Sequence, residues 1–218
     1  MKRLTFWFDV VSPFAYLAFE QLPQALQGTS YEVEYRPILF AGLLNANAHK
    51  GPAEIPAKRT FTYRFVTWQA KRMGIPIKFP PEHPFNPLAL LRLAIACDCR
   101  PEAVQRIFRF VWRDGRLPDL PIEWAELVHD VGLADANARI ADPEVKAALR
   151  ANTDEAISRG VFGVPTLELP PPPGGTAPRL FFGDDALDMA AACLRGDPWF
   201  ETGWEAAANR PVAVQRPR

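Results

Sequence analysis

The stretch Phe6-Trp7-Phe8-Asp9-Val10-Val11-Ser12-Pro13-Phe14-Ala15 joins an apolar run to a helix start across a sharp corner. Bulky apolar and aromatic residues are typical of a buried strand, which we expect over residues 4–9. Serine is a favoured N-cap and proline is the favoured first helical residue, so Ser12 and Pro13 predict a helix over residues 13–26. The Ser12 hydroxyl should therefore lie at a helix N-terminus.

This corner predicts a site for an anion that the chain itself does not supply. The first N–H groups of a helix lack partners and the helix dipole is positive there, so a negative charge is stabilised. In a thioredoxin-type fold the same corner carries the first cysteine of a C-x-x-C pair. Here Ser12 and Ala15 take the two cysteine positions, so a thiolate must come from outside the protein.

Composition excludes several classes of partner. The 218 residues are 48% hydrophobic and carry 25 basic and 25 acidic residues, with no basic stripe, so nucleic acid and anionic membranes are poor candidate partners. No uncharged stretch approaches the roughly 20 residues that span a bilayer. The three cysteines, Cys97, Cys99 and Cys193, cannot form a set of paired disulfides. We expect reduced thiols and a cytoplasmic protein.

The order of predicted elements defines the fold class. A strand over residues 31–37 completes a β-α-β unit, residues 41–159 are mainly helical, and strands at residues 166–169 and 179–182 precede a last helix at 184–194. This order predicts an α/β fold: a thioredoxin-like sheet (residues 1–40 and 160–200) with an inserted all-helical domain (41–159) and a C-terminal tail (201–218). A compact α+β domain of another kind is the alternative.

Val164-Pro165 is the second informative position. A trans proline at a strand start is the ordinary interpretation of an isolated proline. The flanking glycines Gly160 and Gly163, and the strand, hairpin and helix that follow, favour a cis bond facing the Ser12 corner. The backbone of Val164 would then be free to pair with an extended, peptide-like ligand.

Two further clusters are candidate binding residues. Asp184 and Asp185 begin the last helix, where they either cap it or hold the ammonium group of an α-amino acid end; spacing alone does not decide between these. Lys58 and Arg59 begin an earlier helix, where cations oppose the helix dipole. They are either an ordinary solvated pair or residues placed to hold a ligand carboxylate.

Residues 83–87, His83-Pro84-Phe85-Asn86-Pro87, predict an ordered aromatic turn that could form the floor of a pocket. The three histidines show no metal-ligand spacing, so we expect no metal site. Glycine-rich phosphate loops and a G-x-S-x-G elbow are missing from the sequence, which argues against nucleotide binding and α/β-hydrolase chemistry.

Taken together, six stretches resemble the kappa-class glutathione transferases and their bacterial relatives, the 2-hydroxychromene-2-carboxylate isomerases. They are Phe8-Asp9-Val10-Val11-Ser12-Pro13, Arg36-Pro37-Ile38-Leu39, Gly51-Pro52-Ala53-Glu54-Ile55-Pro56-Ala57-Lys58-Arg59, the turn at 83–87, Gly160-x-Phe162-Gly163-Val164-Pro165-Thr166, and the pattern Phe-x-Gly-x-Asp-x-Leu ending at Leu187. The third and fourth stretches resemble the isomerase branch more closely.

The resemblance implies a homodimer with glutathione as cofactor. Ser12 would be the catalytic residue that hydrogen-bonds the glutathione sulfur, and Val164 beside Pro165 would pair with the cysteinyl backbone. The γ-glutamyl end would bind Asp184 and Asp185. Lys58 and His49 would lie near the cofactor.

The resemblance also implies a reaction. A helix N-terminus and the Ser12 hydroxyl would lower the pKa of a bound thiol. The thiolate would add to the enone of a small aromatic substrate, trans-o-hydroxybenzylidenepyruvate, and allow rotation and ring closure to 2-hydroxychromene-2-carboxylate. Lys58, Arg59 or Arg92 would hold the substrate carboxylate. Trp68 and Phe85 would stack on its ring, with Asn86 nearby.

Three alternatives remain open. The first is a kappa-type glutathione transferase or peroxidase, which shares most of these motifs. The second is a thiol oxidoreductase, which Ser12 and Ala15 oppose. The third is a binding module that has kept the fold without the catalysis.

Overall fold

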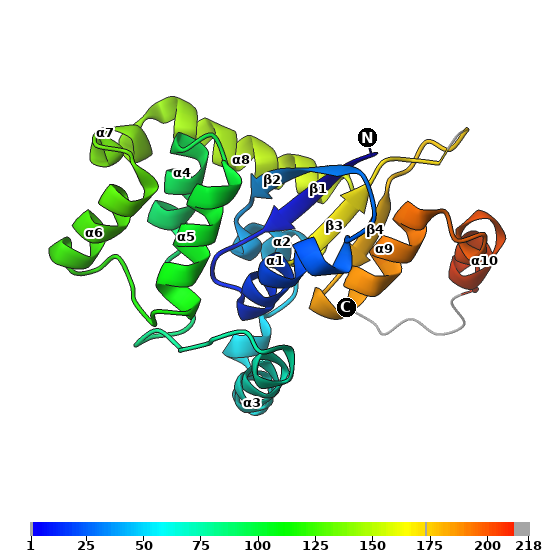
Figure 1. The fold of residues 1–218 in the computed structure, drawn as a ribbon, viewed down its shortest axis with the longest axis horizontal. Coiled ribbons are helices and arrows are strands. Elements are labelled where there is room, and N and C mark those ends of the chain that lie inside the picture. Colours follow the sequence, from blue (N-terminus) through cyan, green and yellow to red (C-terminus); the bar gives the residue numbers. More distant parts are fainter. Residues whose placement is uncertain (1, 173, 212–218) are drawn as a thin grey trace.

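The computed structural model describes residues 2–172 and 174–211. Its sheet has four strands in the order β2-β1-β3-β4 (Figure 1). They are β1 (Lys2–Phe8), β2 (Tyr31–Pro37), β3 (Thr166–Leu169) and β4 (Arg179–Phe182). β1 is parallel to β2 and antiparallel to β3, with Phe6 opposite both Tyr35 and Leu167. The predicted pairing of the two halves of the chain in one thioredoxin-like sheet is therefore confirmed.

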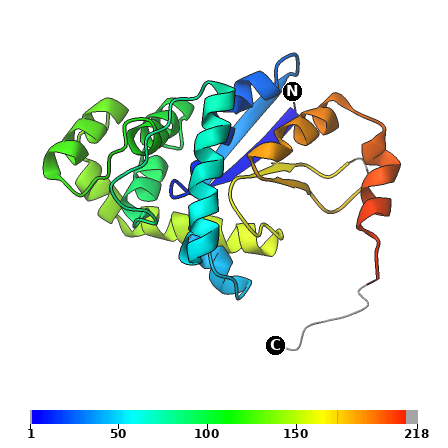
Figure 2. The ribbon, with the colours of Figure 1, turned by 90° about the horizontal axis from the view of Figure 1, so that it is seen from below.

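All elements described between β2 and β3 are helical, as predicted. They are α2 (Phe40–Ala46), the 3-10 turn η1 (Pro52–Glu54), α3 (Pro56–Met73), α4 (Leu88–Ala96), α5 (Pro101–Trp112), α6 (Pro121–Val131), α7 (Ala136–Ala141) and α8 (Pro143–Ser158). Figure 1 and Figure 2 show α3 on the lower side of the molecule, running across it in front of the other elements when seen from below. Several of these helices begin at proline, which costs no helical hydrogen bond in the first turn.

The two faces of β1 pack against different helices. Phe6 and Phe8 are fully buried on the face covered by α1 (Pro13–Ala25), α5 and α9 (Leu187–Arg195). Trp7 points to the other face, where it packs with Ile38 and residues of α8. Side chains alternate between the faces of a strand, so both faces of β1 need apolar residues. This explains why the run from Phe6 to Phe8 shows no polar alternation.

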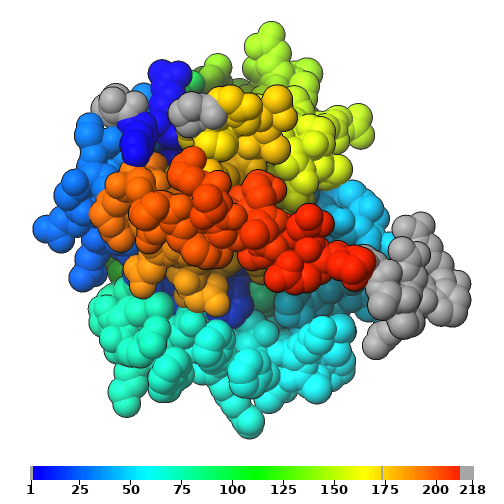
Figure 3. Space-filling model, turned by 90° about the vertical axis from the view of Figure 1, so that its right-hand side faces the viewer, coloured from blue at the N-terminus to red at the C-terminus, as the bar shows by residue number. Residues whose placement is uncertain are grey.

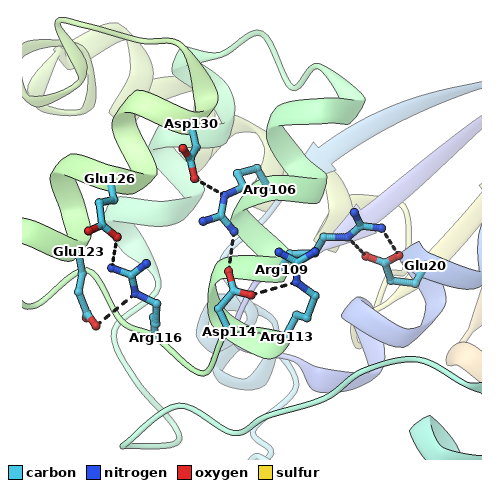
Figure 4. Close-up of polar contacts among 9 residues, drawn as sticks. All are labelled: Glu20, Arg106, Arg109, Arg113, Asp114, Arg116, Glu123, Glu126 and Asp130. Atoms are coloured by element: carbon cyan, nitrogen blue, oxygen red, sulfur yellow. Dashed lines mark hydrogen bonds and ion pairs between the residues drawn. The ribbon is translucent and has the colours of Figure 1, made fainter.

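Ion pairs fix the helical block against α1 (Figure 4). Arg109 on α5 donates two hydrogen bonds, of 2.7 and 2.8 Å, to the carboxylate of Glu20 on α1. Within the block, Arg106 pairs with both Asp114 and Asp130 at 2.7 Å. Bidentate and networked arginines hold geometry better than isolated pairs. The helix that begins at Ser12 is thus held in place at its far end by the insertion.

The C-terminal segment corrects the sequence analysis. A tail was expected from residue 201, but α10 (Trp199–Ala208) is a helix. Phe200 is buried and Trp204 packs on Phe181 of β4, with ring centroids 5.4 Å apart. Figure 3 shows α9 and α10 lying across one face, between the yellow strands and α3. The helix forms because its aromatic residues cover the edge of the sheet. This is a contact between distant parts of the chain, so the local sequence pattern did not predict it. Residues 212–218 of the expected tail lie outside the described residues.

Two short helices in the insertion, α2 and α7, were also not predicted individually. The N-cap of α2 is Leu39, so the usual sequence signal of a helix start is missing there. The N-cap of α7 is Asp135, a favoured residue, but its side chain makes no capping hydrogen bond with any described residue. Among the helices of the described chain, none has the length and apolar character needed to cross a membrane.

Candidate functional site

Ser12 lies where the sequence predicted, at the N-cap of α1. Its Oγ accepts a hydrogen bond from the Ala15 N–H at 3.2 Å and donates one to the Val164 carbonyl at 3.3 Å. Both bonds are long for a hydroxyl, and the side chain is only 8% exposed. Within the described residues, the Phe14 N–H of the first turn has no hydrogen-bond partner. The corner therefore offers a hydroxyl and a free N–H at the positive end of a helix.

The Val164-Pro165 peptide bond is cis and faces the Ser12 corner, in agreement with the sequence analysis. The Val164 N–H finds no acceptor among the described residues, although Val164 is buried. Buried backbone donors are rarely left unpaired, so this one is available to a ligand. The neighbouring residue, Gly163, must be glycine for steric reasons, because a Cβ at this position would collide with the Phe182 ring.

Asp9 is a part of the site that the sequence analysis missed. Its Oδ1 accepts from the Val11 N–H at 2.9 Å and its Oδ2 from the Phe40 N–H at 2.8 Å. The carboxyl thus joins the loop before Ser12 to the start of α2. Because the group is fully buried, desolvation raises its pKa from 3.8 to about 7, against the opposing effect of the two N–H bonds. The sequence signal that could have identified Asp9 as a site residue is its position as an acidic residue within an otherwise apolar run.

His83 and Trp112 hold the same loop from the side of the insertion. The Nε2 of His83 lies 2.8 Å from the Val11 carbonyl oxygen, and its Nδ1 lies 2.8 Å from the Tyr63 hydroxyl. Trp112 donates from Nε1 to the Val10 carbonyl at 2.8 Å. A carbonyl only accepts, so Nε2 of His83 carries the proton and Nδ1 accepts from Tyr63. Burial lowers the pKa of His83, which favours this neutral form.

A cavity of about 510 Å³ opens at this corner. Ser12, Asp9, Val164 and Phe182 come from the sheet side, and η1, α2 and the 83–87 turn complete the wall. Of the predicted ligand-contacting residues, Ser12, Val164, His49 and Phe85 line the cavity. The predicted aromatic floor from Phe85 is therefore found, next to the wall residues Phe14 and Phe40.

The remaining predicted residues lie around the cavity rather than in its wall. Asp184 is buried in the 3-10 turn η2 (Asp184–Ala186), two residues after the cavity-lining Phe182. Its Oδ2 has no hydrogen-bond partner in the part of the chain that the structure describes. Burial and the neighbouring Asp185 raise the pKa of Asp184 to about 6. Asp185 is exposed, and Pro165 contributes through its cis bond. Neither carboxylate is a helix N-cap, because α9 begins only at Leu187 after Ala186.

The predicted residues of α3 and its surroundings are more distant from the cavity. Lys58, Arg59 and Trp68 are exposed on α3, where Trp68 stacks on Phe65. Asn86 precedes α4, and its Oδ1 accepts from the Leu88 N–H at 3.1 Å.

Arg92, the last predicted residue, lines a second hollow between α4 and α8. The Nε of Arg92 is buried and finds no hydrogen-bond partner in residues 2–172 and 174–211.

The cysteines are poorly placed to act as nucleophiles. Cys97 and Cys99 follow α4 in the insertion, and Cys193 is buried in α9. Burial raises the pKa of Cys97, and it raises that of Cys99 to about 12. A reactive thiol needs a lowered pKa and an electropositive setting. The Ser12 corner has that setting but no thiol.

Residues 3–195 match the model of the DSBA-like thioredoxin domain, so the chain belongs to this family. It is 28% identical over 207 residues to glutathione S-transferase kappa 2 of Caenorhabditis elegans, covering 88% of this chain and 92% of that protein. It is 29% identical over 199 residues to 2-hydroxychromene-2-carboxylate isomerase of Sphingobium xenophagum, covering 88% and 98%. The solved structure of a 2-hydroxychromene-2-carboxylate isomerase superposes with a TM-score of 0.75 at 24% identity, covering 93% of this chain and 98% of the other.

Proposed function

We propose that this protein is a glutathione-dependent isomerase that interconverts 2-hydroxychromene-2-carboxylate and trans-o-hydroxybenzylidenepyruvate, or a related aromatic enone. The observation that carries the proposal is the Ser12 hydroxyl at the N-terminus of α1, facing a cavity whose corner has an anion-stabilising setting and no cysteine. A site that stabilises a thiolate without containing one requires an external thiol. The relatives named as transferases and isomerases support this choice.

The residues around the cavity fit glutathione. The free Val164 N–H and the carbonyl beside it can pair with the backbone of the cysteinyl residue. The unpaired Oδ2 of Asp184 can accept from the ammonium group of the γ-glutamyl end, which would relieve its buried charge. The cavity of about 510 Å³ lies within the usual size of small-molecule sites. His49 in the wall, with Lys58 and the exposed Asp185 nearby, is proposed to contact the cofactor at its edges.

When bound, glutathione supplies a thiolate that adds reversibly to the enone, so that the former double bond can rotate. The chain's own contribution begins at Ser12, whose hydroxyl proton would turn from the Val164 carbonyl to the sulfur, in a bond that is stronger when the sulfur is charged. The N–H of Phe14 and the dipole of α1 act in the same direction. His83 and Asp9 hold the preceding loop, so the hydroxyl is positioned before ligand arrives.

The aromatic wall suits the substrate. Phe14, Phe40 and Phe85 provide apolar surface for a ring, and few charged groups line this wall. Trp68, Asn86 and Arg59, which lie outside this wall, remain proposed substrate contacts. The protein is proposed to act as a cytoplasmic homodimer with residues 41–159 as the inserted domain.

A kappa-type glutathione transferase is the second candidate. The match to the Caenorhabditis elegans protein extends over as much of this chain as the match to the isomerase, so sequence similarity favours neither. The two activities differ in the fate of the thiol. An isomerase returns glutathione unchanged, whereas a transferase consumes it.

Titration with glutathione by calorimetry, followed by an isomerisation assay on trans-o-hydroxybenzylidenepyruvate, tests the proposal. We expect saturable binding, and isomerisation that requires glutathione and leaves its concentration unchanged. S-methylglutathione is the matched control ligand, because it keeps the backbone and removes the ionisable thiol. Isomerisation by glutathione-free protein would contradict the mechanism. Consumption of glutathione with an electrophilic aromatic acceptor, and no isomerisation, would favour the transferase.

A further inference from the structure

A second hollow, of about 460 Å³, lies between α4 and α8 and shares one wall residue, Leu39, with the cavity at Ser12. Three basic residues line it: Arg92 from α4, and Lys146 and Arg150 from α8. Asp154 also lines it, so three cations and one carboxylate leave two net positive charges. α4 and α8 lie side by side, which fixes these charges on a common opening (Figure 1).

These three cations form no ion pairs that would stabilise the described part of the fold. None of Arg92, Lys146 and Arg150 is in an ion pair with any other described residue. Lys146 and Arg150 stand four residues apart on α8, where like charges weaken a helix. The Nε of Arg92 is buried and has no hydrogen-bond partner among the described residues. Three cations and a single carboxylate around one opening repel one another on balance, so an anion bound there would lower the free energy of the site.

The rest of the lining is apolar except for Thr153, whose hydroxyl already bonds the Leu149 carbonyl and the Leu39 N–H, and it determines the chemical class of that ligand. Leu39, Leu88 and Leu149 form the wall, with Ala147 at its edge. A bare phosphate would gain nothing from leucine side chains, whereas a carboxylate with an apolar body would contact both parts of the lining. We propose that the hollow between α4 and α8 binds a small apolar carboxylate, with its carboxylate on the cations and its body against the leucines. The proposal does not depend on glutathione chemistry.

Salicylate is a suitable probe, because it combines an aromatic body with one carboxylate. Salicylamide is the matched neutral control, and inorganic phosphate tests the cations alone. Binding is followed by amide NMR shifts in the absence of glutathione. We expect salicylate to shift signals from residues 88–92 and 146–154, with salicylamide and phosphate binding at least about tenfold more weakly. Shifts confined to residues 9–14 and 83–87 would place salicylate in the Ser12 cavity and overturn the proposal.

A variant that removes two of the cations tests the same site by a change in salicylate affinity, without using the positions of the shifted NMR signals. Lys146→Gln with Arg150→Gln alters only exposed side chains, so the fold should be retained. We expect salicylate affinity to fall about tenfold in this double variant and to stay unchanged in Arg195→Gln, an exposed arginine on α9. Equal affinity in all three proteins would overturn the proposal. Because glutathione is omitted throughout, failure here leaves the proposed isomerase untouched, and failure of the isomerase assay leaves this site untouched.

Discussion

Removing the buried carboxyl of Asp9 should flatten the pH dependence of stability. Burial raises the pKa of this group from 3.8 to about 7. An acid whose pKa is higher in the folded state binds its proton more tightly there. The folded state is therefore most favoured below the unfolded pKa, and it loses free energy as pH rises from about 4 to about 7.

The magnitude follows from the two pKa values. Between about pH 5 and about pH 8 the unfolded chain has already lost this proton, while the folded chain releases it almost completely. Integrating the linkage relation over that interval gives a loss of about 2.5 kcal/mol of unfolding free energy from Asp9 alone. Asp184, whose pKa is raised to about 6, acts in the same direction, whereas His83, whose pKa is lowered by burial, acts in the opposite one.

Urea unfolding of wild type and Asp9→Asn at the two pH values isolates the Asp9 contribution, because Asp184 and His83 titrate in both proteins. We expect the wild type to lose about 2.5 kcal/mol more than the variant between about pH 5 and about pH 8. At the lower pH the variant should be less stable by about 1–3 kcal/mol, since the amide –NH2 would face one of the two backbone N–H groups without a lone pair, whereas the hydroxyl oxygen of the protonated carboxyl can still accept.

Asp119→Asn, at an exposed position, is the control and should keep the wild-type slope. If Asp9→Asn does not fold, an NMR titration of the Asp9 carboxyl in the wild type replaces it. A difference in slope below about 0.5 kcal/mol, or an Asp9 pKa near 4, would refute the reasoning.

Further predictions concern the site and its supports. Ser12→Ala should raise the pKa of bound glutathione and lower turnover about tenfold or more; an unchanged pH-rate profile would reduce Ser12 to a helix cap. His83→Phe should cost about 1–3 kcal/mol in urea unfolding by unpairing a buried carbonyl, with partial recovery in His83→Gln; equal stability of the two would exclude this role. Arg109→Met should cost about 2 kcal/mol, because it leaves the Glu20 carboxylate unpaired, whereas Arg3→Met at an exposed pair should cost under about 0.5 kcal/mol; similar losses would contradict the argument. Serine in place of all three cysteines should leave glutathione-dependent activity intact, and its loss would indicate a protein nucleophile.

The sequence by itself determined the parts of this protein that depend on local chemistry. Ser12 followed by Pro13 at the end of an apolar run fixes a helix start, because capping and the missing proline donor act within a few residues. The proline before a short strand similarly predicted the cis bond at Val164. The order of strands and helices was enough for the sheet, since few topologies connect them without crossing.

Only the tertiary structure decided which distant residues meet at the site. Asp9, His83 and Trp112 hold the loop before Ser12 through contacts that span up to 102 positions in the chain. α10 forms because Phe200 and Trp204 reach the edge of the sheet. Equally, Lys58 and Arg59 begin a helix as the sequence indicated, and only the structure shows that their side chains are exposed outside the cavity wall. Spacing along one helix fixes which way a side chain faces, but packing between elements decides whether that face meets a cavity or water.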